Sequence, residues 1–558
     1  MKRTLAILSA VAATALSVPA LADTLVRNIQ GITIDEDGEV QRFVALLIDG
    51  DGRVRETIAS TRDVPKDAEV VIDGKGRTLL PGMIDSHVHV MGIGLGALTL
   101  DLSQTNSLAE AQQAIAAYAA QYPDRAWIIG RGWNQERWGL GRFPTAEELD
   151  AAVADRPVYL ERVDGHASWA NTEAMRRAGI TAETQSPSGG RIETLPGTRA
   201  PSGIFVDAAA ALVQEYVPAP LASDRDVALA RAQEILLAQG VTAVADMGST
   251  IEDWQSFRRA GDAGWLRMRI MSYAAGTDNM ALIGGPGPSQ WLYGDRLRLN
   301  GVKLYLDGAL GSRGAWLKQP YADDPGNRGL PLETPTDLRN LMSRAAFDNF
   351  QLAIHAIGDA ANAEVLTAIE EMAPTYEGDR RWRIEHAQIV DVADIRRFGE
   401  HGIIASMQPV HQTSDREMAE ARLDPPRLEG AYAWQSIRDA GTRLAFGSDA
   451  PVESADPFAG FAAAISRTDS NGQPFGGWYP DERVARSTAL AAFTSNGAYA
   501  GFAEGRFGRL LPGEWADFII VDRDPMLAGV SELRDTRVLQ TWVAGIRVFR
   551  AENGQTGR

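Results

Sequence analysis

Two histidines that lie two positions apart, His87 and His89, end the apolar segment GMIDSHVHV. Side chains two apart on a β-strand point to the same face, so both imidazoles can reach one site. Single histidines, His355 and His386, lie at the ends of QLAIHAI and RWRIEHAQ, and Asp449 ends TRLAFGSD. Imidazole and carboxylate together suit a borderline divalent cation such as Zn²⁺. The sequence therefore predicts a divalent metal site at these residues.

Each of these residues also has an ordinary structural interpretation. A histidine at a strand end, such as His355, is often a hydrogen-bonded core residue, and Asp449 could cap the turn that follows it. Their common position at the carboxyl ends of predicted strands favours the metal interpretation. His401 and His411 are given no metal role, because His401 is expected at a solvated helix end and His411 only borders the site.

The strands that would carry these residues recur along the middle of the chain, which we assign to a barrel domain over residues 81–500. Eight short β-rich runs alternate with helical stretches, which indicates a parallel (β/α)₈ barrel. The runs are GMIDSHVHV, VTAVADMG, RMRIMSYA, LNGVKLYLD, QLAIHAI, RWRIEHAQ, GIIASMQP and TRLAFGSD. Active sites of this fold assemble at the carboxyl ends of the strands, where the candidate ligands lie.

Two regions depart from the barrel pattern, so the fold class is α/β, a distorted TIM barrel with additions. The first strand ends near Val90 and the second starts near Val241, a gap that predicts an inserted α+β subdomain at about residues 115–225. Residues 23–80 and 501–558 contain short alternating strands and turn pairs such as Asp49-Gly50. These segments predict a small β-sandwich domain built from both ends of the chain.

The composition is that of a globular protein, with 45% hydrophobic residues, 23% charged residues and a formal net charge of −18. This charge argues against a nucleic-acid partner, because phosphates require basic patches. The absence of cysteine excludes disulfide bonds and a lipid-modified cysteine anchor. No apolar run beyond the N-terminal segment is long enough for a transmembrane helix. We expect a small-molecule substrate as the partner and allow for a homodimer.

Residues 1–22 are predicted to be a secretory signal peptide. Lys2 and Arg3 precede the apolar run LAILSAVAATALSVP, and Ala20 to Ala22 form the small-x-small pattern for cleavage after Ala22. An uncleaved anchor is the alternative. Cleavage implies a secreted protein without membrane insertion, located in the periplasm if the organism is a Gram-negative bacterium.

Several motifs together resemble the amidohydrolase superfamily. They are PGMIDSHVH on the first predicted strand, a lysine on the fourth, the histidines that end the fifth and sixth, and FGSDAP on the eighth. The segments VKLYLDGALGSRGA, IHAIGDAAN, RIEHAQ and DGHASWAN resemble the YtcJ-like branch, which includes N-substituted formamide deformylases. The similarity extends over essentially the whole mature chain. It implies a metal-dependent hydrolase that acts on carbon–nitrogen bonds other than peptide bonds.

The resemblance also accounts for Lys303, a lysine in the apolar run LNGVKLYLD. In such sites the strand-four lysine is carboxylated and bridges two metals. Burial and nearby dications would disfavour an ammonium group, and arginine cannot take this role because it stays protonated. The alternative is a buried ion pair of Lys303 with Asp307 or Asp449 beside a single metal. The resemblance implies two Zn²⁺ ions bridged by carboxylated Lys303, with the further ligands His87, His89, Asp449, His355 and His386.

The predicted reaction is hydrolysis of the C–N bond of a small N-substituted amide with an apolar or aromatic group. A divalent metal activates water to hydroxide near neutral pH and polarises a carbonyl. Asp449 would be both ligand and catalytic base, taking a proton from water and delivering it to the leaving nitrogen. The alternatives are hydrolysis of a cyclic imide, lactone or ester at the same site, and a non-catalytic periplasmic binding protein.

Four residues are candidate substrate contacts. In the branch that the chain resembles, the residue corresponding to His166, in VDGHASWAN, faces the substrate; a structural place at a helix start is the alternative. Arg313, in the Gly-rich segment GALGSRG, could contact a substrate oxygen or be an ordinary surface arginine. Trp133 and Trp169, with Trp138, could line an apolar pocket or pack in a core.

Overall fold

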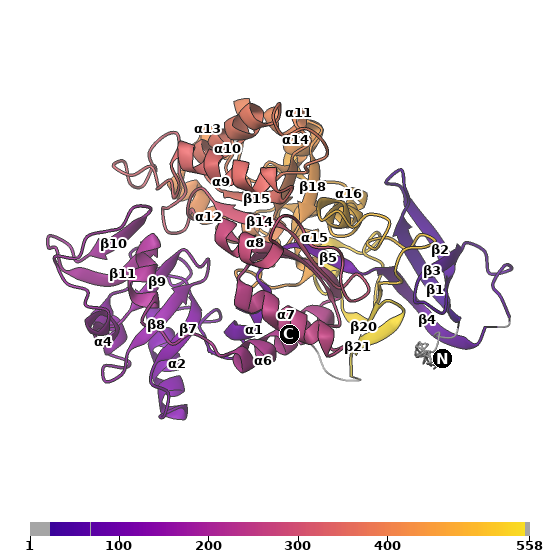
Figure 1. The fold of residues 1–558 in the computed structure, drawn as a ribbon, viewed down its shortest axis with the longest axis horizontal. Helices are drawn as coiled ribbons and strands as arrows, with labels where there is room; N and C mark the ends of the chain where they lie inside the picture. Colours follow the sequence, from indigo (N-terminus) through magenta and orange to yellow (C-terminus); the bar gives the residue numbers. More distant parts are fainter. Residues whose placement is uncertain (1–22, 67, 553–558) are drawn as a thin grey trace, which may run out of the picture.

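The computed structural model of the chain describes residues 23–66 and 68–552. Three β-sheets organise it, and Figure 1 shows the barrel between the inserted subdomain and a sheet of terminal strands. The predicted signal peptide, residues 1–22, lies outside the described residues. Within the described ranges, no helix is both long and apolar enough to cross a membrane.

The central sheet contains eight strands, and every neighbouring pair in it is parallel. Strands such as β5 and β15 are buried along their whole length, as expected when helices cover the outside of a parallel sheet. The predicted (β/α)₈ barrel is therefore confirmed. Its strands are β5 (Met83–Val88), β12 (Val241–Ser249), β13 (Arg269–Ala275), β14 (Leu297–Tyr305), β15 (Gln351–Ala356), β16 (Arg383–His386), β17 (Ile404–Met407) and β18 (Arg443–Phe446).

The helices around the barrel begin at residues suited to helix starts. Thr250 caps α7, where its side chain accepts a hydrogen bond from the N–H of Asp253 while Asp253 accepts from the N–H of Thr250. Thr334 caps α9, and Pro335 follows at its first position. The helices are α1 (Val90–Gly96), α6 (Ala222–Ala238), α7 (Ile251–Asp262), α8 (Gly276–Gly284), α9 (Pro335–Phe347), α10 (Asp359–Met372), η2 (Val392–Asp394), α11 (Arg397–Glu400), α12 (Pro409–Arg422), α13 (Pro425–Leu428), α14 (Trp434–Asp439), α15 (Pro457–Ser466), η3 (Pro480–Glu482), α16 (Arg486–Ala492) and α17 (Ser495–Ala500).

The barrel closes between β18 and β5 through backbone hydrogen bonds at the carboxyl ends of the two strands. The N–H of Asp449 donates to the carbonyl of His87 at 2.8 Å, and the N–H of His89 donates to the carbonyl of Ala450 at 2.9 Å. The strands approach closely here, because a Cβ on Gly447 would lie only 2.5 Å from the nitrogen of His87. The closing seam therefore lies at the carboxyl end of the barrel, where the candidate ligands are found.

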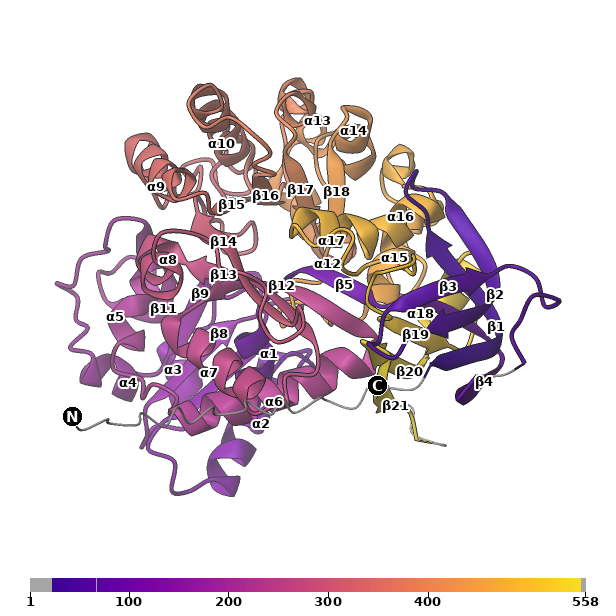
Figure 2. The same ribbon diagram turned by 45° about the vertical axis from the view of Figure 1, so that its right-hand side comes forward.

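Strands from both ends of the chain form one mixed sheet of seven strands, in the order β21-β20-β19-β4-β1-β2-β3. At its centre, β4 is parallel to β1 and antiparallel to β19. Figure 2 shows these strands together beside the barrel. The strands of the two ends thus form one hydrogen-bonded sheet, and residues of β1–β3 share a hydrophobic core with residues of β19 and β20. The elements are β1 (Thr24–Ile34), β2 (Val40–Ile48), β3 (Val54–Ile58), β4 (Val70–Pro81), β19 (Phe518–Val521), α18 (Val530–Arg534), β20 (Val538–Val543) and β21 (Ile546–Arg550).

The insert between β5 and β12 has a sheet of its own, with six strands in the order β10-β11-β9-β8-β7-β6. Its core contains Trp133, Trp138 and Trp169, whose rings lie 6.1–6.4 Å apart. The elements are β6 (Leu100–Asp101), α2 (Leu108–Gln121), β7 (Ile128–Trp133), α3 (Ala146–Asp150), β8 (Val158–Arg162), β9 (Ala167–Ala170), α4 (Thr172–Arg177), β10 (Gly190–Thr194), β11 (Pro201–Asp207), η1 (Ala208–Ala210) and α5 (Ala211–Gln214).

Candidate metal centre

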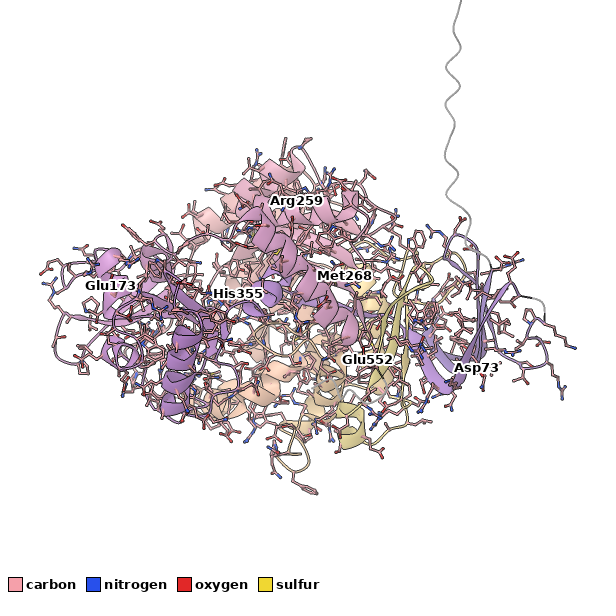
Figure 3. All side chains as sticks on the ribbon, turned by 90° about the horizontal axis from the view of Figure 1, so that it is seen from below. Asp73, Glu173, Arg259, Met268, His355 and Glu552 are labelled. Atoms are coloured by element: carbon pink, nitrogen blue, oxygen red, sulfur yellow. The ribbon has the colours of Figure 1, made fainter. Side chains whose placement is uncertain are left out.

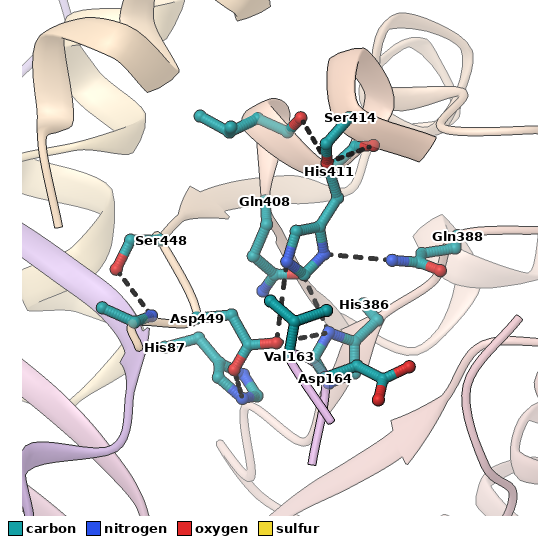
Figure 4. A network of polar contacts seen from close by, with 12 residues as sticks. His87, Val163, Asp164, His386, Gln388, Gln408, His411, Ser414, Ser448 and Asp449 are labelled. Carbon is teal, nitrogen blue, oxygen red and sulfur yellow. Dashed lines mark hydrogen bonds and ion pairs between the residues drawn. The ribbon is translucent and has the colours of Figure 1, made fainter. Parts of the chain in front are cut away.

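The carboxylate of Asp449 lies at the centre of a cluster of imidazoles (Figure 4). Its Oδ1 is 3.1 Å from Nε2 of His89 and 3.5 Å from Nε2 of His87. Its Oδ2 is 3.7 Å from Nε2 of His411 and 3.9 Å from Nδ1 of His386. Donors from the carboxyl ends of separate barrel strands therefore converge on one carboxylate.

His355 completes the cluster, with its ring centre 4.5 Å from that of His386. Its Nε2 is buried and has no hydrogen-bond partner within the described part of the chain. A buried nitrogen without a partner costs free energy that a bound cation would offset. The Nδ1 of His386 lies 2.9 Å from Oε1 of Gln408, which leaves the lone pair of its Nε2 free to bind a cation. These donors fit a divalent metal.

The charges of the cluster also suit metal binding. Burial holds the pKa of His87, His355 and His386 well below the usual range, so each imidazole is neutral and offers a lone pair. Burial alone would raise the pKa of Asp449, but the surrounding positive charge and the hydrogen bond with His89 outweigh burial and hold that pKa well below its usual value. The site thus combines neutral nitrogen donors with an ionised carboxylate, which is the form that metals bind.

Two of the candidate ligands have unusual backbone conformations. His386 has φ 76° and Asp449 has φ 59°, values in the left-handed region that residues with a side chain rarely adopt. Such conformations persist where the surrounding structure imposes them, and they cluster at functional sites. The main chain at the ends of β16 and β18 therefore fixes the direction of both side chains.

Buried charged residues hold His87 in place. Its Nδ1 lies 2.7 Å from Oε2 of Glu385, and the guanidinium of Arg383 donates to Oε1 of the same carboxylate at 2.7 Å. Arg383 and Glu385 are fully buried on β16. We had not predicted this support, although two charged residues at alternate positions of the apolar run RWRIEHAQ were a signal that could have found it.

Lys303 points into the same cluster and is 1% exposed. Its Nζ is 3.5 Å from Nε2 of His87, and no carboxylate among residues 23–66 and 68–552 forms an ion pair with it. The buried ion pair considered with Asp307 or Asp449 is therefore not formed. Asp307 instead accepts backbone N–H groups at 2.8–2.9 Å. Burial lowers the pKa of Lys303 to about 8, which makes its amine available as a neutral nucleophile.

A cavity of about 770 Å³ opens above these donors. The barrel contributes His89, Lys303, His355, His386, His411 and Asp449 to its lining. The insert contributes further lining residues, among them Arg131, Glu161, Asp164 and His166. Figure 3 shows His355 in the middle of the molecule, between Glu173 of the insert and Asp73 of the terminal sheet.

His166 lines the cavity close to the cluster of imidazoles. Its ring centre is 5.0 Å from that of His355, and its Nδ1 is 2.8 Å from Oδ1 of Asp207. Burial lowers the pKa of His166, but the hydrogen bond with Asp207 more than offsets this effect, so the pKa lies above its usual value. His401 ends α11 on the surface as expected. His411 is 5% exposed and lies deeper in the site than the border position expected for it.

The structure places the other candidate substrate contacts away from the cavity lining. Trp133 and Trp169 are fully buried in the core of the insert, where their indole N–H groups donate to backbone carbonyls at 2.9 and 2.8 Å. These indoles are satisfied inside the subdomain, so they pack rather than line the pocket. Arg313 donates to Asp323 at 2.7 Å, and of this pair only Asp323 lines the cavity.

A parallel eight-stranded barrel with histidine and aspartate donors at its carboxyl end defines the class, a metal-dependent hydrolase on a TIM-barrel scaffold. The chain belongs to the amidohydrolase family, because the model described as "Amidohydrolase family" matches residues 70–549. The resemblance found in the sequence motifs is thereby confirmed.

Three relatives match the chain over nearly its full length. Protein LONG AFTER FAR-RED 3 of Arabidopsis thaliana is 33% identical, over 95% of this chain and 92% of the relative. Putative amidohydrolase YtcJ of Bacillus subtilis is 30% identical over 93% and 97%, and the N-substituted formamide deformylase of Arthrobacter pascens is 29% identical over 94% and 98%. These matches support the YtcJ-like branch.

A solved structure of a metal-dependent hydrolase from Pyrococcus horikoshii shares the fold, with a TM-score of 0.73 and 26% identity. The match covers 91% of this chain and 99% of the other. The barrel, the insert and the terminal sheet thus belong to one shared architecture.

Proposed function

We propose that the protein hydrolyses the C–N bond of a small N-substituted amide. The observation that carries this proposal is the position of Asp449, which faces a cavity of about 770 Å³ and is surrounded by imidazoles. The similarity to an N-substituted formamide deformylase over nearly both whole chains supports this type of bond. The cavity has room for a substrate with an apolar or aromatic group on its nitrogen.

We propose that the site holds two Zn²⁺ ions, since neutral imidazoles and carboxylates are typical zinc ligands. Bound divalent ions would lower the pKa of water and polarise the scissile carbonyl. The neutral amine form of Lys303 favours a carbamate, whose two oxygens could be shared between cations. The residues that would hold the ions are His87, His89 and Asp449 for one, His355 and His386 for the other, and carboxylated Lys303 for both.

The chain's own groups account for the proton movements. Asp449 is ionised, so its carboxylate can accept a proton from the attacking water and deliver it to the leaving nitrogen. Glu385 keeps a proton on Nδ1 of His87, which leaves a lone pair on Nε2 of that ring for a cation in the site. Side chains of the insert, including Arg131 and His166, enclose the cavity and orient the substrate within it.

A matched substrate panel tests the proposal. Purified protein is assayed with N-alkyl and N-aryl formamides and acetamides, with esters of the same acyl and substituent groups, and with a cyclic imide and a lactone. We expect the amides to be preferred by kcat/KM, and activity to disappear with a chelator and return with Zn²⁺. Preference for the esters or cyclic compounds would show that the same site hydrolyses an ester, a lactone or a cyclic imide instead. Less than one equivalent of bound metal, with no chelator-sensitive hydrolysis, would contradict an enzymatic role.

We also propose that the protein is exported and cleaved after Ala22. The basic start, the short apolar run and the small residues before the cleavage point support this. N-terminal sequencing of the protein recovered from a periplasmic fraction should begin at Asp23. An intact N-terminus on protein that stays with the membrane fraction would indicate an anchor instead.

A further inference from the structure

Two neighbouring histidines of the site are held by glutamines through different atoms (Figure 4). Nδ1 of His386 lies 2.9 Å from the amide oxygen of Gln408. Nδ1 of His411 lies 3.0 Å from the amide nitrogen of Gln388. The two rings are stacked with an interplanar angle of 19° and centres 6.2 Å apart. With the amides in these orientations, each contact assigns the ring proton to one nitrogen.

An amide oxygen only accepts hydrogen bonds, and an amide nitrogen only donates them. His386 must therefore carry its proton on Nδ1, which leaves a lone pair on Nε2. His411 must accept at Nδ1, which places its proton on Nε2. Nδ1 of His87 and of His166 also faces an acceptor oxygen, as in His386. Among the site histidines with a described side-chain partner at Nδ1, His411 is thus the one whose Nε2 carries a hydrogen and can donate a hydrogen bond.

The donor of His411 has no hydrogen-bond partner of its own among residues 23–66 and 68–552. It is 3.7 Å from Oδ2 of Asp449, which is beyond hydrogen-bond distance. The His411 side chain lines the cavity but is only 5% exposed, and its Nε2 is itself buried, so an acceptor would have to lie directly against the cavity wall to use this N–H group. Leaving such a group unpaired costs free energy unless something in the cavity accepts from it.

We propose that His411 is a catalytic residue whose Nε2–H donates a hydrogen bond to the carbonyl oxygen of the substrate. This inference rests on the hydrolytic function proposed above. Attack on a carbonyl moves negative charge onto its oxygen, and a fixed donor aimed at that oxygen stabilises the transition state. The reacting carbonyl lies next to Asp449, within reach of a donor 3.7 Å from that carboxylate. Gln388 is the positioning residue, because it fixes which nitrogen of His411 carries the proton.

The same geometry argues against His411 as a metal ligand. A group of His386, His411 and Asp449 has donor atoms close enough together to hold an ion. The nitrogen of His386 nearest to Asp449 is Nδ1, which already contacts Gln408. On His411 the nitrogen nearest to Asp449 is Nε2, and the proton assigned to it leaves no lone pair there. Loss of His411 should therefore leave the metal content unchanged.

Kinetics and metal content of three variants test the assignment. With an N-substituted formamide as the probe, His411→Phe should lower kcat about 100- to 1,000-fold, as loss of one donor to a developing oxyanion does. The Zn²⁺ content should stay at the wild-type level, and His411→Gln, which offers an amide N–H, should recover part of the loss. His401→Phe changes the same residue type on the surface and should match the wild type. Wild-type-like kcat in His411→Phe, or a loss of bound Zn²⁺, would overturn the inference.

Nitrogen NMR of Zn²⁺-loaded protein labelled with ¹⁵N-histidine gives a readout independent of turnover. The chain has seven histidines, and the signal that disappears in His411→Phe identifies the residue. We expect the Nε2–H tautomer in the wild type and a mixture of tautomers in Gln388→Leu. A proton on Nδ1 of His411 would overturn the inference whatever the kinetics show. Wild-type protein that turns over no carbonyl probe would remove the proposed function and this inference together, whereas active enzyme with an inert His411 would remove only the latter.

Discussion

Nδ1 of His87 lies 2.7 Å from Oε2 of Glu385, so a candidate metal ligand is oriented by a carboxylate that itself never reaches the cavity. Arg383 compensates the charge of that carboxylate, and all three side chains are buried. The orientation of His87 is thus set by buried side chains inside the barrel and not by residues at its rim.

Replacing Glu385 by glutamine tests this support. The change keeps the shape but leaves the buried guanidinium of Arg383 without a counter-charge, which should lower the free energy of unfolding by about 3–5 kcal/mol. Affinity for Zn²⁺ should fall about 10- to 100-fold, because the partner that orients His87 is weakened. Urea denaturation and competition with a chelator measure the two effects. Glu400→Gln, on the surface at the end of α11, is the control. Unchanged metal affinity in Glu385→Gln would contradict the supporting role.

Replacing Asp449 by asparagine removes the proposed catalytic base with little change in size. We expect the protein to fold and kcat to fall about 100- to 10,000-fold, the range for loss of a positioned base. Circular dichroism and steady-state kinetics check the two parts. Asp439→Asn, at the end of α14, should behave as the wild type. If Asp449→Asn turned over substrate at the wild-type rate, the assignment of Asp449 would fail.

Lys303→Ala should lose activity, because this variant lacks the side chain that we propose to bridge the two ions. Short carboxylic acids such as acetate, added with Zn²⁺, should restore part of the activity, since their two oxygens can occupy the place of the carbamate. The measurement is kcat as a function of acid concentration at fixed metal. Full activity without added acid would show that no bridge is needed.

The pKa of Lys303, lowered by burial to about 8, predicts how carboxylation depends on pH. The neutral amine reacts with CO₂, so ¹³C-bicarbonate labelling of metal-free protein should rise with pH through about 8 instead of near the usual lysine value of 10.5. The folded state binds fewer protons than the unfolded state between these two values. Metal-free wild type should therefore gain stability relative to Lys303→Met as pH rises across this window. A ¹³C signal that appears only near the usual lysine pKa would contradict the burial effect.

The packing of Trp133 predicts an effect on stability and not on substrate binding. Trp133→Ala should destabilise the insert by about 3–5 kcal/mol through the cavity it leaves. Trp133→Phe keeps most of the volume and should leave KM for the formamide probe unchanged. Denaturation curves and steady-state kinetics separate the two. A large rise in KM in the phenylalanine variant would indicate that Trp133 contributes to substrate binding.

Much of the barrel and its donors could be predicted because both depend on local patterns. Buried parallel strands are continuous apolar runs, and a polar residue that ends such a run, as His355 and Asp449 do, stands out. The barrel geometry then brings these ends together whatever the connecting loops contain.

Features that depend on tertiary contacts were harder to predict. Whether Trp133 faces a cavity or a core depends on which face of the insert sheet meets the barrel, and periodicity does not contain that information. His411 follows a short strand and begins a helix, so its depth in the site depends on how α12 packs. The tautomer of His411 depends on Gln388, which lies 23 positions away in the chain.

The central position of β4 has a consequence for biogenesis. One edge of this strand pairs with β1, near the N-terminus, whereas the other pairs with β19, which is made only after the entire barrel. Until translation is almost complete, that edge has unsatisfied N–H and C=O groups that a second nascent chain could capture. Delayed folding with chaperone protection would therefore favour correct maturation, and truncation near the C-terminus would leave a template for aggregation.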